Sequence, residues 1–177
     1  MHHLFLKRNL KCRTPAFNRY ILDTVIVIPI ANPQMGSEER AAVDRVLRSG
    51  IIAQGPEVAN FEEEFANMCG VKYAVATSNG TTAGHLAMLS NGIEPGDEVI
   101  TTPFTFFATA SVIIMAGAKP VFVDIEENGF CLDPVKAEEA ITEDTKAIQP
   151  VHLYGELADM PSFQVICDEH NIALIED

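Results

Sequence analysis

The chain has no tryptophan and little positive charge, and the shortage of positive charge narrows the classes of partner that it can bind. Only 12 of its 177 residues are lysine or arginine, against 25 aspartates and glutamates, so the formal net charge is −13. A protein that binds nucleic acid needs a basic surface to neutralise phosphates, so this balance excludes nucleic acid as the main partner. Apolar residues make up 47% and aromatic residues 7%, which is typical of a soluble globular protein with a real core.

Paired cysteines and long apolar runs are also lacking. The four cysteines, at positions 12, 69, 131 and 167, lie far apart and form no Cys-x-x-Cys pair. This spacing indicates neither a disulfide framework nor a zinc site, and it predicts reduced thiols in a cytoplasmic protein. No apolar run is long enough to span a membrane, so no membrane partner is expected.

The few basic residues are concentrated at the start of the chain. Residues 1–26 carry five basic residues and one acid, whereas the rest carries 7 basic and 24 acidic residues. This start lacks the small-residue cleavage site of a signal peptide. We therefore expect residues 1–26 to be a basic leader outside the fold, an upstream extension of the reading frame, and residues 27–177 to form the domain.

From Ser37 onward, helical and strand patterns alternate along the chain. The patterns predict strands at residues 73–77, 98–102, 120–125, 147–153 and 172–176. They predict helices at residues 37–50, 56–70, 82–91, 108–116, 133–141 and 159–170. This alternation is typical of crossover units, so we expect an α/β fold with a mostly parallel sheet and helices on both faces.

A segment rich in small residues and hydroxyls directly follows the first expected strand. It includes Ser78, Gly80, Thr81 and Thr82 and opens a helix. Small residues let a phosphate approach the backbone, and the free N–H groups of a helix start point at it. An ordinary capped strand-to-helix turn explains the same residues, and the segment is neither a Walker P-loop nor a Gly-x-Gly-x-x-Gly fingerprint.

Three other expected strand ends carry polar or aromatic residues. Phe106 follows one strand and could stack on a flat cofactor ring, whereas its neighbours Phe104 and Phe107 are expected to be core. His152 and Tyr154 follow another strand and could hydrogen-bond a ligand, although a lone histidine there is more often structural. Asp177 ends the last strand, where its carboxylate could hold a pyridinium nitrogen protonated or cap the next element. The carboxyl ends of parallel strands share one edge, so all these residues fall on the ligand-binding edge of the expected sheet.

In their order along the chain, these motifs resemble the DegT/DnrJ/StrS family of sugar aminotransferases, which use pyridoxal 5′-phosphate (PLP). The resemblance covers residues 28–177 and is carried by the segments 50–56, 61–62, 78–81, 95–100, 103–106, 117–124, 150–155 and 175–177. It implies an incomplete large domain of the aspartate aminotransferase-like fold (fold type I), with the C-terminal part and the small domain outside this chain. It also implies a homodimer with its site between subunits.

The resemblance assigns a role to each candidate residue. Gly80, Thr81 and Thr82 are expected to hold the PLP phosphate. Phe106 is expected to stack on the pyridine ring, and Asp177 to pair with the ring nitrogen. His152 and Tyr154 would line the substrate side, where the full enzyme takes an amino group from an amino-acid donor and passes it to a nucleotide-linked keto-sugar.

The family's Schiff-base lysine normally follows this aspartate by a few dozen residues. The chain's own lysines precede expected strands, lie on a helix or belong to the leader, so none is expected at the site. We therefore expect no catalytic residue within this chain and no transamination by the chain alone. The alternatives are a non-catalytic fragment or split-gene product, a PLP-dependent sugar dehydratase of the same family, and a nucleotide-binding doubly wound domain, which the missing glycine fingerprint disfavours.

Overall fold

The computed structural model describes residues 21–22, 25–26, 29 and 31–177. The expected leader therefore lies largely outside the described residues. Within it, strands β1 (Ile21–Leu22) and β2 (Val25–Ile26) pair antiparallel. The chain divides into two compact units, one ending at Glu57 and the other running from Val58 to Asp177.

Helix α1 (Ser37–Ser49) is the main element of the first unit. The Glu39 side chain caps its start, because Oε2 accepts a hydrogen bond of 2.6 Å from the Gly36 N–H. Gly50 ends it in the left-handed conformation at φ 74°, which glycine adopts without steric cost. Helix α2 (Pro56–Cys69) follows and continues into the second unit, so both helices form where the sequence predicts them.

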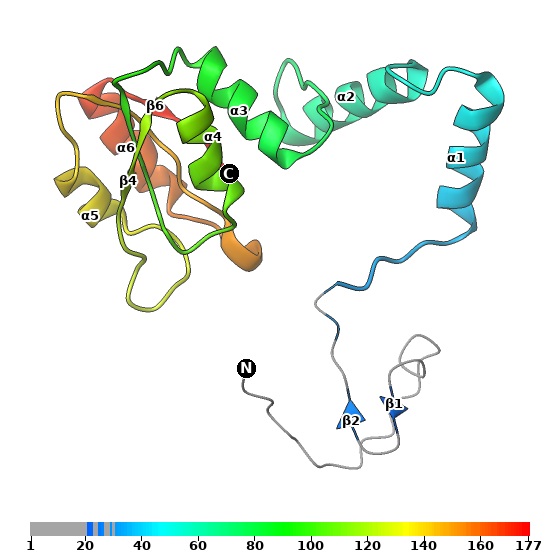
Figure 1. The fold of residues 1–177 in the computed structure, drawn as a ribbon, viewed down its shortest axis with the longest axis horizontal. Coiled ribbons are helices and arrows are strands. Elements are labelled where there is room, and N and C mark those ends of the chain that lie inside the picture. The colour runs from blue at the N-terminus through cyan, green and yellow to red at the C-terminus, as the bar shows by residue number, and fades with distance from the viewer. Residues whose placement is uncertain (1–20, 23–24, 27–28, 30) are drawn as a thin grey trace. The chain divides into compact units, whose positions relative to one another are not determined.

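The second unit is built on a parallel sheet of four strands in the order β4-β3-β5-β6 (Figure 1). The strands are β3 (Glu98–Thr101), β4 (Lys119–Phe122), β5 (Thr145–Ile148) and β6 (Ala173–Leu174). Helices α3 (Gly80–Ser90), α4 (Ala108–Met115), α5 (Pro134–Glu139) and α6 (Met160–His170) connect and flank them. The predicted α/β fold with a parallel sheet is confirmed.

Alternating strand residues divide the core into two layers. Val99 and Ala147 pack with residues of α3 and α4, such as Met88 and Val112. Their neighbours Ile100 and Ile148 point the other way and pack with α5 and α6, where Phe163 is fully buried. Because successive side chains of a strand point to opposite faces, these two clusters show that helices cover both faces of the sheet.

The strand predicted at residues 73–77 is wrong. In the structure this segment has no strand assignment, and Tyr73 and Val75 are 73% and 75% exposed. Its Ala76 N–H donates instead to Glu62 Oε1 at 2.8 Å. Strand composition produces a strand only where another backbone offers hydrogen bonds, and no described residue pairs with this segment.

The strand predicted at residues 147–153 is shifted. Strand β5 covers Thr145–Ile148, and beyond it the Gln149 N–H still donates to Ile100 O at 2.8 Å. Pro150 follows and has no N–H to donate, so the regular ladder ends there, although single backbone hydrogen bonds to the segment after β6 continue. Among the described residues, no helix is both long and apolar enough to cross a membrane.

Cysteine reactivity should report on this fold directly. Burial raises the pKa of the Cys167 thiol from 9.0 to about 11, and its Sγ lies 3.8 Å from Ala173 O as a donor, which requires the protonated form. The unfolded chain releases this proton at a lower pH, so the free energy of unfolding should be unaffected below pH 9 and should fall as the pH rises toward 11.

At pH 8, where only roughly 0.1% of such a thiol is ionised, iodoacetamide should label exposed Cys69 at least ~100-fold faster than Cys167. Peptide mass spectrometry measures both rates, and equal rates in native buffer would contradict this packing.

Candidate active site at the carboxyl edge of the sheet

The backbone around Asp177 is fixed by its neighbours at the carboxyl edge. Beyond β6, the Ile175 N–H donates to Ile148 O and the Asp177 N–H donates to Pro150 O, both at 3.0 Å. In return, the His152 N–H donates to Asp177 O at 2.9 Å. Parallel pairing therefore continues past the last assigned strand and places Asp177 beside the segment that follows β5.

Two buried residues hold one oxygen of the Asp177 carboxylate. Thr109 Oγ1, on the first turn of α4, donates to Asp177 Oδ2 at 2.6 Å. Gln149 Nε2 approaches the same oxygen at 3.4 Å. Within the described part of the chain, no group donates to Asp177 Oδ1, so this oxygen is left as a free acceptor.

Neither Thr109 nor Gln149 received a role from the sequence. Thr109 lies just after the segment 103–106, among several other threonines and phenylalanines, and nothing local distinguishes it. Gln149 did offer a signal: a glutamine between Ile148 and Pro150, in a strand expected to be buried, is unusual unless it has a polar partner. That partner, Asp177, lies 28 residues away.

Helix α3 begins as the sequence predicts, with a capped and partly open start. Asn79 is the N-cap, and its Oδ1 accepts from the Thr82 N–H at 2.9 Å and from Thr82 Oγ1 at 3.1 Å. The N–H groups of Gly80 and Thr81 make no hydrogen bond within the described residues, and nothing lies within 4 Å of a Cβ placed on Gly80. The Thr82 N–H is therefore engaged in the cap, while the two preceding N–H groups and the open space above Gly80 remain for an anion.

The three phenylalanines after β3 are all accessible. Phe106 is 77% exposed, and its carbonyl accepts from the Thr109 N–H at 3.1 Å, which ties it to the start of α4. Phe107 is 79% exposed and Phe104 is 43% exposed, so the prediction that these two are core is wrong. Phe107 is largely uncovered after β3, whereas the ring of Phe104 is partly covered by other aromatic side chains.

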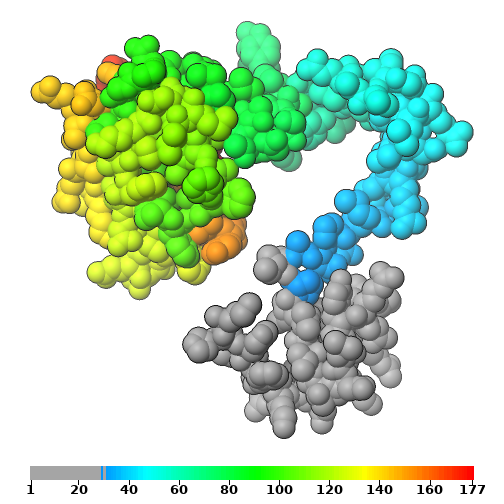
Figure 2. Space-filling view, viewed as in Figure 1, coloured from blue at the N-terminus to red at the C-terminus, as the bar shows by residue number. Residues whose placement is uncertain are grey.

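An aromatic cluster that the sequence did not predict lies at the same edge. The rings of Phe104, Phe130 and Tyr154 meet at centroid distances of 5.7–6.5 Å, with Tyr154 edge-on to both phenylalanines. Tyr154 adopts φ 57°, in the left-handed region, and the orange segment that contains it lies at the surface of this unit (Figure 2). The cluster places Tyr154 beside Phe104, whereas their separation in sequence gave no sign of it.

His152 is held by hydrogen bonds at both ring nitrogens. Its Nδ1 accepts from the Ala158 N–H at 3.1 Å, so the other nitrogen, Nε2, carries the proton and faces Glu176 Oε2 at 3.1 Å. The His152 side chain is 24% exposed. The imidazole is therefore oriented by the backbone on one side and by an acid next to Asp177 on the other.

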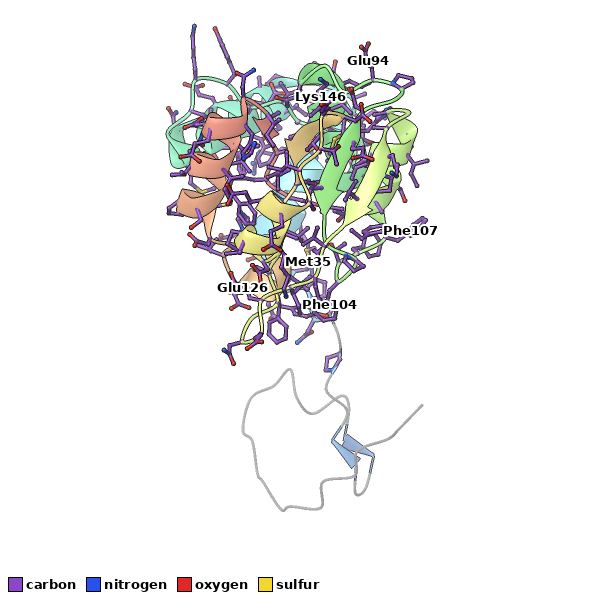
Figure 3. The ribbon with its side chains drawn as sticks, turned by 90° about the vertical axis from the view of Figure 1, so that its left-hand side faces the viewer. Met35, Glu94, Phe104, Phe107, Glu126 and Lys146 are labelled. Atoms are coloured by element: carbon purple, nitrogen blue, oxygen red, sulfur yellow. The ribbon has the colours of Figure 1, made fainter. Side chains whose placement is uncertain are left out.

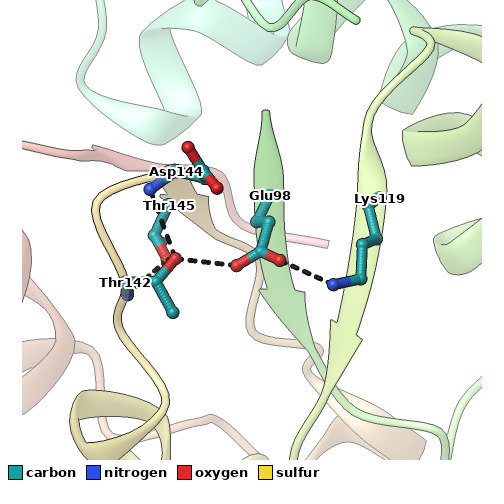
Figure 4. Close-up of polar contacts among 5 residues, drawn as sticks. All are labelled: Glu98, Lys119, Thr142, Asp144 and Thr145. Carbon is teal, nitrogen blue, oxygen red and sulfur yellow. Dashed lines mark hydrogen bonds and ion pairs between the residues drawn. The ribbon is translucent and has the colours of Figure 1, made fainter. Parts of the chain in front are cut away.

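The described lysines near the sheet lie at its opposite edge. Figure 3 shows Lys146 and Glu94 at one end of the sheet and Phe104 and Phe107 at the other. Lys119, the first residue of β4, donates to Glu98 Oε1 at 2.7 Å (Figure 4).

Glu98 is held further by Thr142, whose Oγ1 donates to Oε2 at 2.8 Å (Figure 4). The Lys119 hydrogen bond and then the Thr142 hydrogen bond lower the pKa of Glu98, and Glu98 in turn raises the pKa of Lys119. Lys119 is thus a cation engaged at the amino edge. Lys136 is also engaged, with Nζ at 3.2 Å from Ile125 O and 3.3 Å from Asp133 Oδ2.

Chemically, the described residues offer two unpaired N–H donors at the start of α3, an acceptor at Asp177 Oδ1 and exposed phenylalanine rings after β3. Within the described residues, no group of three or more His, Cys, Asp or Glu side chains is placed to hold a metal ion. Groups of these kinds suit a flat ligand that carries an anionic group and a protonated ring nitrogen.

Comparison with known proteins gives a consistent result. The model of the DegT/DnrJ/EryC1/StrS aminotransferase family matches residues 33–177. A spore coat polysaccharide biosynthesis protein, SpsC, from Bacillus subtilis is 47% identical over 150 residues, which are 85% of this chain and 39% of that protein. A UDP-2-acetamido-2-deoxy-3-oxo-D-glucuronate aminotransferase from Pseudomonas aeruginosa is 43% identical over 85% of this chain and 42% of its own length. A GDP-perosamine synthase from Caulobacter vibrioides is 44% identical over 85% of this chain and 41% of its own length.

Solved structures agree with the sequence relatives. An aminotransferase from Psychrobacter cryohalolentis superposes with a TM-score of 0.79 at 40% identity, covering 84% of this chain and 38% of that one. NtdA from Bacillus subtilis, solved with bound cofactor PMP, gives a TM-score of 0.77 at 33% identity over 97% of this chain and 38% of its own. The chain thus spans about two fifths of the length of the proteins that it matches.

Proposed function

The chain belongs to the DegT/DnrJ/EryC1/StrS aminotransferase family, and from that premise we propose that it is the cofactor-binding part of a PLP-dependent aminotransferase acting on a nucleotide-linked keto-sugar. The observation that carries the proposal is Asp177, whose Oδ2 is satisfied inside the protein while Oδ1 is free at the carboxyl edge. An enzyme of this class needs such an acid to face the cofactor's ring nitrogen.

The residues at this edge fit the cofactor. The free N–H groups of Gly80 and Thr81, at the positive end of the α3 dipole, would bind its phosphate. The Thr82 N–H is engaged by Asn79, so Thr82 would contribute through the ordered cap rather than through that N–H. Exposed Phe106 would cover one face of the ring and exclude water from it.

Asp177 would hold a proton on the ring nitrogen, because each charge stabilises the other. With that proton in place, PLP supplies a sink for the electron pair left when an amino acid loses its α-proton. His152 and Tyr154 would line the substrate side, where the Glu176 contact fixes the imidazole and the aromatic cluster fixes the phenol ring.

The names of two relatives support the proposed substrate class. They are a UDP-keto-glucuronate aminotransferase and a GDP-perosamine synthase, both named for nucleotide-linked sugars. We propose a sugar acceptor of that class and an amino-acid donor. The placement of Lys119, Lys136 and Lys146 supports a Schiff-base lysine supplied by a segment outside these 177 residues, so this chain alone would hold the cofactor without transaminating.

We also propose a domain organisation and a cellular compartment for the chain. Residues 27–177 would form the N-terminal portion of the PLP-binding large domain and residues 1–26 a leader that is not part of it. A cytoplasmic location suits the free thiols of Cys69, Cys131 and Cys167, since reducing compartments keep cysteines unpaired.

We further propose a homodimer, supported by apolar side chains on α1 and α2. Val43 and Leu47 on α1 are 59% and 64% exposed, and Phe61 and Met68 on α2 are 55% and 74% exposed. An amphipathic helix with an uncovered apolar stripe is stabilised by a partner surface. We expect sedimentation velocity to show dimers or larger species at micromolar concentration. Glu replacements at Val43 and Leu47 should weaken association at least ~10-fold, whereas Arg45→Glu on the same helix should not. A concentration-independent monomer would contradict the dimer.

Cofactor binding itself tests the proposed function. Pyridoxamine 5′-phosphate (PMP), the aminated form of PLP, cannot form a Schiff base with surface lysines, so its binding reports only the non-covalent cradle. Isothermal titration calorimetry of the 177-residue chain should show one PMP bound per chain, and inorganic phosphate should compete with it. Failure of PMP to bind, or binding unaffected by phosphate, would contradict the proposed function.

A further inference from the structure

The Asp177 carboxylate is not presented evenly to the carboxyl edge. Oδ2 receives the hydroxyl proton of Thr109 at 2.6 Å and faces the Gln149 amide at 3.4 Å, whereas no described group donates to Oδ1. The two oxygens therefore have separate environments: Oδ2 is hydrogen-bonded within the protein, and Oδ1 accepts from no described group. This asymmetry depends on two side chains that come from different elements.

The hydroxyl of Thr109 has a fixed direction. A threonine hydroxyl has one proton, and an ionised carboxylate can only accept, so that proton lies on the bond to Asp177. Thr105 Oγ1, 2.9 Å from Thr109 Oγ1, must then be the donor of their shared hydrogen bond. The result is a directed chain from Thr105 through Thr109 to Asp177, at the start of α4 where the helix dipole favours a negative charge.

The buried Gln149 side chain also contacts the Asp177 carboxylate. It is 1% exposed, on the strand face where Ala147 packs into the apolar cluster with α4. Its Oε1 is buried without a hydrogen-bond partner, although burying an unpaired polar atom is unfavourable. Turning the amide over would place Oε1 against Oδ2, two acceptors facing each other, so the observed orientation is the only one that suits an ionised Asp177.

An apolar residue of the same volume would fill this position without the unpaired oxygen. The amide therefore serves the carboxylate rather than the stability of the core. Such a cost in stability is typical of a functional position.

We propose that Thr109 and Gln149 are positioning residues that occupy Oδ2 of Asp177 and so present Oδ1 to the ring nitrogen of the cofactor. This inference rests on the proposed function, because it assumes that Asp177 faces the cofactor. Neither residue touches the cofactor in this arrangement; each acts through the aspartate. Their effect should therefore be found in cofactor binding and in ring protonation.

The test compares four variants by PMP titration of the 177-residue chain and by urea unfolding. Thr109→Val and Gln149→Met should each weaken PMP binding about 10-fold, while Thr109→Ser keeps the hydroxyl and should bind as the wild type does. Ser111→Ala is the matched control, because its hydroxyl is on the same helix but donates to Phe107 O. Gln149→Met should also unfold at the same or a higher urea concentration, since it removes the unpaired oxygen.

A second readout separates positioning from packing. With ¹⁵N-labelled PMP at saturation, the ring-nitrogen shift should move toward the unprotonated value in Thr109→Val and Gln149→Met and stay unchanged in Ser111→Ala. If both variants bind PMP as the wild type does while Asp177→Asn binds weakly, the positioning role is overturned and the proposed function stands. If Asp177→Asn also binds normally, the proposed function fails. A fall in both affinity and stability for Gln149→Met, with an unchanged ring-nitrogen shift, would assign Gln149 a packing role instead.

Discussion

Replacing Asp177 with asparagine is expected to weaken PMP binding by about 10- to 150-fold. The substitution keeps the shape and the acceptor for Thr109 Oγ1, so the buried side of the site is preserved. It removes the charge that pairs with a protonated ring nitrogen. A hydrogen bond to a charged group contributes about 1.5–3 kcal/mol, which corresponds to that range of affinity. Isothermal titration calorimetry at pH 7.5 measures the change directly.

The matched control is Glu176→Gln. Glu176 is the neighbouring residue and carries the same charge. Its Oε2 faces the His152 imidazole rather than the position that we propose for the ring nitrogen of the cofactor. We expect PMP affinity to change by less than ~3-fold in this variant. Equal losses in both variants would show that the effect is long-range electrostatics of an acidic chain and would count against a specific pair at Asp177.

The sequence predicted the helices and most strands because their signals are local. Caps such as Asn79 and Asp159, and glycine stops such as Gly50, act within one turn and can be recognised without knowing the fold. The parallel sheet followed from the alternation of elements. Residues 73–77 could not be predicted in the same way, because a strand needs a pairing partner and its local composition was correct for one.

The sequence named candidate residues at the expected strand ends, but none of the side chains that hold them. Asp177 was singled out because it ends the last expected strand, at the edge where parallel sheets bind ligands. Thr109 and Gln149 are 68 and 28 residues from Asp177, and only the folded chain shows that they share one oxygen. Phe104 was assigned to the core from its hydrophobicity, whereas its position after the strand leaves it 43% exposed beside Tyr154.

The most destabilising substitution we expect is Phe163→Ala. Phe163 is fully buried on α6, in the cluster that also holds Ile100 and Leu132. Truncating a buried phenylalanine costs about 3–5 kcal/mol, from lost burial and the remaining cavity. Domains of this size are stabilised by only about 5–15 kcal/mol, so the variant should unfold at a much lower urea concentration. Val165→Ala, two residues along the same helix and 56% exposed, should change the free energy of unfolding by less than about 1 kcal/mol.

The location of Phe163 also predicts what should not change. It packs on the sheet face covered by α5 and α6, whereas Thr109 and the apolar cluster beside Gln149 lie on the face covered by α4. Below its unfolding transition, Phe163→Ala should therefore bind PMP within ~3-fold of the wild type, while saturating PMP should raise its unfolding midpoint because ligand binds only the folded chain. A large loss of PMP affinity in fully folded Phe163→Ala would show that the two faces of the sheet are coupled, and the site would then depend on the whole core rather than on the α4 face.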